Sequence, residues 1–507
     1  METNRAWRFR YDSTSYFNRS FALNIARTKL PIALIAVLAC APSALADDLP
    51  DLGESARADL SPQLERRIGE SIMNDIRLHE PSYVEDEEIN DYLRQLGGRL
   101  VAASSNPGGD FNFFAVRDNT VNAFAMFGGF IGVNTGTLLT AQSESELAGV
   151  LAHEISHVTQ NHLARQIAKE KQNSIASLIT MAVGILAARS NSQVAGAAIA
   201  SAQAGSIQAQ LAYTRDFERE ADRFGYLALE KSGMDVHGMS DFFERLQKAG
   251  RVYESNAPIY LRSHPMTVER ISDMQNRVHE APYRQVPSSL DFLLVRSKLR
   301  TQAGTPRELV AEYETALREK KYVSEISTRY GLCYALLRAK DTPGAQREMD
   351  VLKALKPASA MIAGLAAEIR IAAGDLPSAL PLYRDAMQRY PQSRALVYGY
   401  AEALYTGRQY EQALIFLESK LQFALSDFKL YGLQAKTYAA QGKRLAEHRA
   451  QAEFYMLQGQ LGPAVEQLQF AQRAGDGSFY EQSAVDARLR ELRKLQLEEA
   501  KQKRNSG

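Results

Sequence analysis

The segment His153-Glu154-Ile155-Ser156-His157 decides how the chain is interpreted, because it sets two imidazoles four residues apart. In a helix, four residues make just over one turn, so both rings leave the same face within reach of a single metal ion. Glu154 lies about 100° around the helix, where its carboxylate can take a proton from water held by the metal. The segment therefore predicts a zinc-peptidase helix with His153 and His157 as ligands and Glu154 as general base.

The helix around this segment is predicted by the flanking sequence. Ser143 followed by Glu146 is a capping box, which marks a helix start. Apolar residues recur at helical spacing along one face, at Leu147, Val150, Leu151, Ile155 and Val158. We expect the motif to lie on an amphipathic helix that begins near Ser143.

A second candidate motif lies at Arg215–Asp222, where Glu218 and Asp222 are four residues apart and share a helix face. Catalytic zinc needs three protein ligands and one open position, and a Glu from a second helix can complete the set. An Asp one turn further on can accept the outer N–H of a ligand His and fix its tautomer. Spacing alone leaves Glu218 and Glu220 as alternatives for the third ligand.

Each motif alone has a simpler explanation. Two His on a helix are often solvated or buried polar groups, and a lone Glu218 is usually a solvated helix carboxylate. The occurrence of both motifs in one chain favours the zinc interpretation.

Five motifs in order give the chain a family resemblance over about residues 65–280. They are Asn122–Ala125, Gly128–Ile131, His153–His157, Glu218–Asp222, and His264-Pro265 with Arg270. This series resembles the zinc peptidases related to CAAX prenyl protease and to the membrane heat-shock protease HtpX. The resemblance implies a zincin-like (gluzincin) domain that binds one Zn²⁺, and it implies Glu218 rather than Glu220 as the third ligand.

His264 and Arg270 are further candidates, because His-Pro followed six residues later by Arg recurs at this place in the family that the chain resembles. A surface histidine is the simplest explanation of His264. In the functional alternatives, His264 either steadies the oxyanion or binds zinc as a fourth ligand that displaces water and keeps the enzyme idle. The inhibitory role is favoured, and the candidate catalytic residues are Glu154, Asp222, His264 and Arg270.

Length and charge limit the classes of function. At 507 residues the chain is expected to hold two or three domains, and 45% hydrophobic residues is ordinary for a globular protein. The net charge of +1 and the absence of a basic stripe with interleaved aromatic residues argue against a nucleic-acid partner.

The N-terminus predicts export. A basic leader, an apolar run at 30–39 and Ala44-Leu45-Ala46 are typical of a signal peptide over residues 1–46, cleaved after Ala46. In the alternative, Val37-Leu38-Ala39-Cys40 is a lipoprotein box that leaves a lipidated Cys40. With cleavage after Ala46, Cys333 is the only cysteine of the mature chain, so no intramolecular disulfide is expected.

The middle of the chain divides by pattern. Residues 47–64 are expected to be a flexible lead-in and residues 65–285 the peptidase domain, with two or three short strands between Phe111 and Asn134 that offer a substrate an edge for pairing. An apolar run within 174–188 is about twelve residues long, too short to cross a bilayer, which needs about twenty. With the Ala/Gly-rich 193–205, it predicts a buried helical hairpin or, alternatively, a mobile or membrane-touching flap.

The last third is predicted to be an α-solenoid over residues 286–485. Small residues recur every 34 positions, the tetratricopeptide period, at Ala345, Ala379 and Ala413. A degenerate unit follows at Gly459–Ala464, and residues 486–507 are expected to be a charged helical tail. The alternative is a generic helical bundle. A solenoid is expected to be energetically separate from the peptidase and to bind segments of other proteins.

The predicted fold class is α+β, mostly helical: a zincin-like domain followed by tetratricopeptide repeats. This layout resembles the family of periplasmic proteases of Gram-negative bacteria that assist the assembly of outer-membrane β-barrel proteins. The resemblance implies quality control of stalled or misfolded clients, with the repeats contacting the barrel assembly and lipopolysaccharide insertion machinery. The alternatives are a chaperone or scaffold with a minor zinc site, against which Glu154 argues, and a lipid-anchored peptidase.

Overall fold

The computed structural model describes residues 60–169, 215–252, 259–282 and 284–505. The chain divides into the units Met1–Asp51 and Leu52–Gly507, and every described residue belongs to the second. The predicted signal peptide, Cys40, most of the lead-in and the apolar segments at 174–205 lie outside the described residues.

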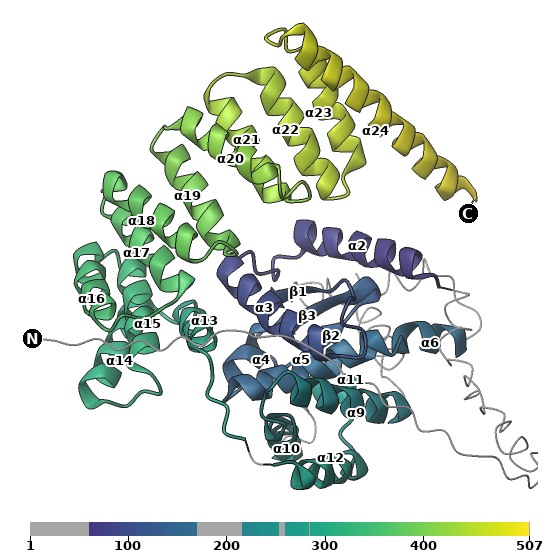
Figure 1. Cartoon of the computed structure of the whole chain (residues 1–507), viewed down its shortest axis with the longest axis vertical. Helices are drawn as coiled ribbons and strands as arrows, with labels where there is room; N and C mark the ends of the chain where they lie inside the picture. Colours follow the sequence, from purple (N-terminus) through teal and green to yellow (C-terminus); the bar gives the residue numbers. More distant parts are fainter. Residues whose placement is uncertain (1–59, 170–214, 253–258, 283, 506–507) are drawn as a thin grey trace, which may run out of the picture. The chain divides into compact units, whose positions relative to one another are not determined.

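A small sheet forms where short strands are predicted. It consists of β1 (Asn112–Val116), β2 (Ala123–Ala125) and β3 (Phe130–Asn134), in the order β1-β3-β2 (Figure 1). The strand β3 pairs in parallel with β1 and antiparallel with β2, with Ala125 opposite Ile131. The strand β2 therefore lies at an edge of the sheet.

Helices surround this sheet in the peptidase part of the chain. The first begins at Pro62, three residues before the expected helical region, because Ser61 caps it and proline is tolerated in a first turn. The helices are α2 (Pro62–His79), α3 (Glu87–Ala103), α4 (Thr135–Thr140), α5 (Glu144–Thr159), α6 (His162–Lys169), α9 (Arg215–Lys231), α10 (His237–Val252), α11 (Ile259–Ser263) and α12 (Val268–Glu280). A short 3₁₀ turn, η1 (Phe127–Gly129), precedes β3.

The helix α5 carries the His153–His157 motif. The Ser143 hydroxyl accepts the backbone N–H of Glu146 at 3.2 Å, as a cap requires. The Glu146 carboxylate departs from the predicted capping box, because it accepts the backbone N–H of Gln142 at 2.6 Å and pairs with Arg245. The cap of α5 thus includes a contact from α10 that the local sequence does not predict.

Two glycines allow neighbouring helices to approach α5 closely. A Cβ at Gly149 of α5 would lie 2.8 Å from the Cα atom of Met239 on α10. A Cβ at Gly225 of α9 would lie 3.1 Å from the backbone nitrogen of His153. The second approach sets α9 directly against the motif, and it brings Glu218 and Asp222 to the imidazole of His153.

The C-terminal half is a series of antiparallel helix pairs, as the repeat pattern predicts (Figure 1). Ala345, Ala379 and Ala413 are fully buried on the second helices of successive pairs. The helices are α13 (Leu290–Thr301), α14 (Pro306–Glu319), α15 (Glu325–Arg338), α16 (Thr342–Ala354), α17 (Ala360–Ala372), α18 (Leu376–Arg389), α19 (Arg394–Thr406), α20 (Tyr410–Leu421), α21 (Phe428–Ala440), α22 (Arg444–Leu457), α23 (Leu461–Arg473) and α24 (Phe479–Asn505).

Two parts of the solenoid differ from expectation. The pair α21 and α22 lacks the alanine that recurs every 34 residues in the preceding pairs, because the position 34 residues after Ala413 is Glu447. The charged tail is part of α24, which begins at Phe479 rather than at residue 486. This helix buries Val485, Leu489 and Leu492 in a cluster with residues of α22 and α23, so it caps the end of the solenoid.

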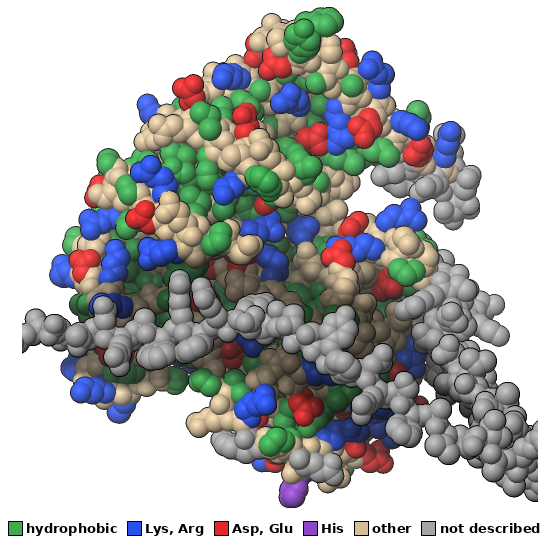
Figure 2. Space-filling view, in the orientation of Figure 1, with side chains coloured by type: hydrophobic (Ala, Val, Ile, Leu, Met, Phe, Trp, Pro, Cys, Tyr) green, Lys and Arg blue, Asp and Glu red, His purple; other side chains and the backbone are tan. Residues whose placement is uncertain are grey.

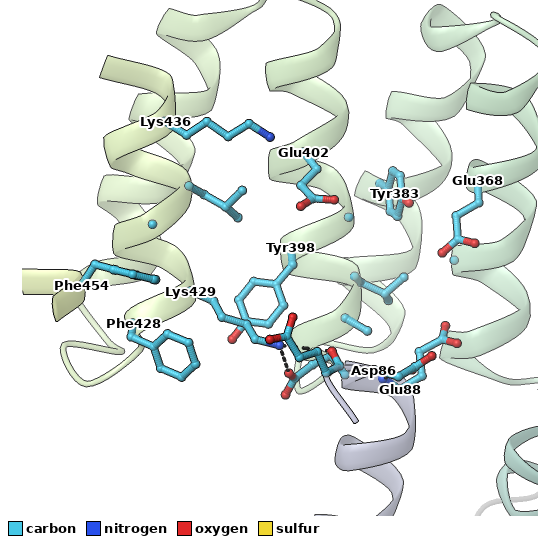
Figure 3. A pocket seen from close by; sticks show the side chains of 18 of the residues that line it. Asp86, Glu88, Glu368, Tyr383, Tyr398, Glu402, Phe428, Lys429, Lys436 and Phe454 are labelled. Carbon is cyan, nitrogen blue, oxygen red and sulfur yellow. Dashed lines mark hydrogen bonds and ion pairs between the residues drawn. The ribbon is translucent and has the colours of Figure 1, made fainter. Parts of the chain in front are cut away.

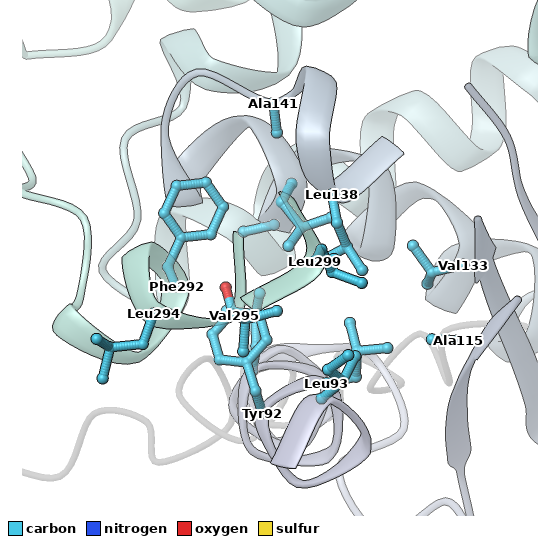
Figure 4. Close-up of a cluster of buried hydrophobic side chains, with 14 of the residues drawn as sticks. Tyr92, Leu93, Ala115, Val133, Leu138, Ala141, Phe292, Leu294, Val295 and Leu299 are labelled. Atoms are coloured by element: carbon cyan, nitrogen blue, oxygen red, sulfur yellow. The ribbon is translucent and has the colours of Figure 1, made fainter. Parts of the chain in front are cut away.

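The first repeats and the peptidase part share one hydrophobic core. A single cluster of buried side chains runs from Val84 to Ile369. Figure 4 shows Phe292, Val295 and Leu299 of α13 among Leu93 of α3 and Leu138 of α4. The helices from α13 to α17 are therefore not packed as a separate unit, contrary to the expectation from repeat proteins in general, whereas the later repeats bury side chains in clusters of their own.

No helix in the described part of the chain is long and apolar enough to cross a membrane. On the face shown in Figure 2, Lys and Arg side chains alternate with Asp and Glu, without a continuous field of either sign. This mixture agrees with the balanced composition of the sequence.

Candidate metal centre

Four buried side chains converge on one point: His153, His157, Glu218 and His264. Each offers one nitrogen or oxygen, and these four atoms lie within 4.8 Å of one another. The helix α5 supplies the first two, α9 supplies Glu218, and His264 directly follows α11. The set of imidazole nitrogens and a carboxylate oxygen is one that zinc prefers.

The short distances inside this cluster require a proton or a cation between the ligand atoms. His153 Nε2 lies 3.0 Å from His157 Nε2 and 3.3 Å from His264 Nδ1. The same His264 nitrogen lies 3.0 Å from Glu218 Oε1. Ring nitrogens that face one another in a buried space repel unless a proton or a cation lies between them. The donor set therefore fits a metal ion.

Glu154 lies beside the cluster rather than in it. Both carboxylate oxygens are buried, and no donor in the described residues is aligned to hydrogen-bond them, although the Ala125 backbone amide of β2 approaches and favours ionisation. The imidazole Nε2 of His264 lies 3.5 Å from Glu154 Oε1. Burial raises the pKa of Glu154 above its ordinary value. A buried carboxylate with free acceptor capacity next to a metal site is suited to accept a proton.

The outer nitrogen of His153 faces Asp222. The distance from His153 Nδ1 to Asp222 Oδ1 is 3.0 Å. Arg270 holds Asp222 with two contacts of 2.7 and 2.8 Å and also reaches Glu218 Oε2 at 2.7 Å. Burial opposes ionisation of Asp222, but the Arg270 guanidinium outweighs it and keeps the pKa of Asp222 below its ordinary value. Arg270 thus holds the carboxylates of Asp222 and Glu218 in place.

The charged neighbours also act on His153. Burial alone would lower its pKa, but the hydrogen bonds to Asp222 and Glu218 outweigh burial and raise the pKa of His153 to about 9. In the metal-free protein this ring therefore favours the doubly protonated, positively charged form at neutral pH. Binding of a metal ion must displace one of these protons.

Two residues of the centre are absent from the sequence predictions. His162, at the start of α6, lies with its Nδ1 2.9 Å from His157 Nδ1. Tyr260 of α11 stacks on the His264 ring with centroids 4.7 Å apart and 27° between the planes. The position of His162, five residues after His157, is the only signal in the sequence that points to it.

The structure also separates the two glutamates that spacing leaves open. Glu218 belongs to the cluster, whereas Glu220 Oε2 lies 3.1 Å from His162 Nε2 and 2.8 Å from Arg165 Nη1. All seven predicted site residues lie in the cluster or in direct contact with it: His153, Glu154, His157, Glu218, Asp222, His264 and Arg270.

Comparisons with known proteins agree with this geometry. Residues 87–278 match the model of peptidase family M48, and residues 370–437 match the tetratricopeptide repeat. The chain is 33% identical to the beta-barrel assembly-enhancing protease of Yersinia pestis, over 89% of this chain and 92% of that protein. It is 30% identical to the protein of the same name from Escherichia coli K12, over 94% and 98% of the two chains. The chain therefore belongs to the family of beta-barrel assembly-enhancing proteases, and its peptidase part is a metallopeptidase of family M48.

Proposed function

We propose that this protein is a zinc endopeptidase of the periplasm that degrades outer-membrane β-barrel proteins when their assembly stalls or fails. The observation that carries the proposal is the buried four-donor cluster with Glu154 beside it. The names of the relatives support the client class, because they are beta-barrel assembly-enhancing proteases at about 30% identity over nearly the whole chain.

His153, His157 and Glu218 would hold the zinc ion. Zinc bound there supplies a Lewis acid that polarises the scissile carbonyl and makes water more acidic. Glu154 takes the proton from the attacking water and passes it to the leaving amine. Asp222 keeps the proton of His153 on Nδ1, so that the Nε2 lone pair points at the metal. The edge strand β2, which ends at Ala125 beside Glu154, offers backbone groups to an extended substrate.

His264 acts in this proposal as a fourth ligand that holds the enzyme idle. Its Nδ1 lies 3.0 Å from Glu218 Oε1 and 3.3 Å from His153 Nε2, so it would compete with water for a bound metal ion. Tyr260 holds the ring in this orientation by stacking. Removal of the imidazole in His264→Ala should therefore increase cleavage of clients or of the protease itself. A loss of activity would favour the alternative role at the oxyanion.

A groove on the solenoid supports a role in binding partners. It has a volume of about 570 Å³ and is lined by side chains of α17, α19 and α21 together with the start of α3. Figure 3 shows Glu402, Lys436 and Tyr398 around this space. Aromatic side chains on the surface of a repeat array suit an extended polypeptide segment. In this proposal the groove contacts clients or the barrel assembly and lipopolysaccharide insertion machinery.

Residues 1–46 would direct export and be removed after Ala46. Mass spectrometry of the N-terminal peptide of the mature protein tests this cleavage site. A lipidated Cys40 would instead indicate an anchored peptidase.

The test of catalysis is Glu154→Gln. The amide keeps the size of the side chain but cannot take a proton, so proteolysis of an unfolded β-barrel client should fall by about 10²–10⁴. Zinc content should stay at one per protomer, because Glu154 is not among the four converging donors. Glu230→Gln, an exposed glutamate on α9, is the matched control.

Two results would contradict the proposal. The first is a decrease of less than tenfold in Glu154→Gln. The second is full complementation of a deletion strain by that variant, which would indicate that the repeats act as a chaperone and that the metal centre is dispensable.

A further inference from the structure

The metal ligand His157 has an outer hydrogen-bond partner of a different kind from that of His153. His153 faces the carboxylate of Asp222, whereas His157 Nδ1 lies 2.9 Å from the Nδ1 atom of another imidazole, His162. His162 is fully buried. Its position beside the metal cluster therefore needs a chemical explanation.

A left-handed residue places His162 at this point. The helix α5 ends at Thr159, and Asn161 has a φ of 53°, a conformation that asparagine tolerates better than most residues. The chain turns there and begins α6 at His162. The ring then stacks on Phe217 of α9, with centroids 4.6 Å apart and 12° between the planes.

The geometry determines where each proton lies. His157 Nε2 faces the cluster, so a His157 that binds metal has its lone pair on Nε2 and its proton on Nδ1. The Nδ1–H group of His157 then donates to His162 Nδ1, which must be an acceptor. His162 carries its own proton on Nε2 and donates it to Glu220 Oε2, 3.1 Å away.

Glu220, the last residue in this series of hydrogen bonds, is held in place by an arginine. Arg165 Nη1 lies 2.8 Å from the same Glu220 oxygen. Glu220 Oε2 thus accepts hydrogen bonds from both Arg165 and His162, which fixes the carboxylate beside the His162 ring. Arg165 and His162 thus both donate to Glu220, and His157 donates to His162, so every donor in this series has an acceptor.

We propose that His162 is a positioning residue for the metal centre: it fixes the tautomer and ring orientation of His157, and Glu220 fixes the tautomer of His162. This inference rests on the proposed zinc function of the cluster. Outer partners of ligand histidines raise ligand basicity, and their loss costs about 10- to 100-fold in metal affinity.

The test compares His162→Phe with His162→Asn. Phenylalanine keeps a ring against Phe217 but has no acceptor, whereas the Asn side-chain oxygen replaces Nδ1 as an acceptor for His157. Metal-free proteins are titrated with Zn²⁺ against a chromogenic chelator. We expect about 10- to 100-fold weaker zinc binding in His162→Phe and a smaller loss in His162→Asn. His79→Phe, at an exposed histidine, is the matched control and should bind zinc like the wild type.

A spectroscopic measurement separates positioning from packing. With Co²⁺ in place of Zn²⁺, the Nδ1–H proton of His157 gives a shifted, exchangeable nuclear magnetic resonance signal. This proton should exchange slowly with water in the wild type and in His162→Asn, and quickly in His162→Phe. Glu220→Gln, which removes the charge but keeps the side-chain length, should speed the exchange.

The inference is overturned if His162→Phe binds zinc within twofold of the wild type, or if His162→Asn loses as much affinity as His162→Phe. Should His162→Phe fail to fold, the other two variants decide: rapid exchange in His162→Asn, or unchanged exchange in Glu220→Gln, overturns it. A wild-type protein that binds no zinc would contradict the proposed function instead, so the two failures are distinguishable.

Discussion

Arg270 gives the sharpest test of how the centre is stabilised. Its guanidinium is almost fully buried and contacts two buried carboxylates: it makes two contacts to Asp222, at 2.7 and 2.8 Å, and one to Glu218, at 2.7 Å. It also donates to the backbone carbonyl of Pro265 at 2.8 Å. Arg270→Gln would leave two buried carboxylates without the guanidinium that contacts both of them.

The magnitude follows from these contacts. Hydrogen bonds to charged groups contribute about 1.5–3 kcal/mol each, and they are not additive within one network. Removal of one partner from a buried ion pair costs about 3–5 kcal/mol. We therefore expect Arg270→Gln to lower the free energy of unfolding of metal-free protein by about 3–5 kcal/mol. The loss should be smaller with zinc bound, because the metal then neutralises Glu218.

Hydrogen–deuterium exchange of α9 and α12 measures this loss locally, with and without Zn²⁺. The control is Arg277→Gln on the same helix, where the arginine pairs with Asp273 at 3.0 Å and both side chains are more than one third exposed. That exposed pair should contribute no more than about 0.5 kcal/mol. If the amides of α9 and α12 are as well protected from exchange in Arg270→Gln as in Arg277→Gln, then Arg270 does not anchor the ligands and the reasoning is wrong.

Three further outcomes are expected. Lys298→Met removes the ammonium group that lies 2.6 Å from Glu88 and should destabilise the junction of repeats and peptidase by about 3–5 kcal/mol in denaturant unfolding; an unchanged midpoint would contradict this. Burial raises the pKa of Glu88 above its ordinary 4.5, and that of Glu368 likewise, so the folded state binds these protons more tightly than the unfolded state. The stability of the junction should therefore fall as the pH rises above 4.5. A stability that increases with pH would contradict the raised pKa values. Ala379→Leu adds bulk at a fully buried helix contact and should cost about 1–3 kcal/mol, whereas Ala354→Leu at an exposed site should cost little; thermal unfolding of the two variants makes the comparison.

The sequence predicts the parts of the centre that local periodicity controls. His153 and His157 share a face because they are four residues apart on a capped helix, and Glu218 and Asp222 share a face for the same reason. The fold class and the repeat architecture are likewise confirmed, because the small residues at helix contacts recur at a fixed period.

Contacts between distant elements are not accessible in this way. The hydrogen bonds from His157 to His162 and from His162 to Glu220 depend on a left-handed turn and on the approach of α9. The spacing of residues in the sequence reveals neither. Glu88 looks like a solvated helix-start carboxylate in the sequence, but it is buried against Lys298 and Tyr330 from the repeats. The pair α21 and α22 escapes detection because burial there is carried by Leu445 and Ala450 rather than by an alanine at the repeat position.

The acidic start of α3 has a consequence for how this architecture can change. Glu87 pairs with Lys429 of α21 at 3.1 Å, and Glu88 pairs with Lys298 of α13 at 2.6 Å. One short peptidase segment thus meets cations from two widely separated repeats. A solenoid taken from another protein would leave both glutamates without these partners unless it carried cations at the same two places. The two halves are therefore not interchangeable modules, and chimaeras between relatives should function only when the start of α3 and the repeats come from the same parent.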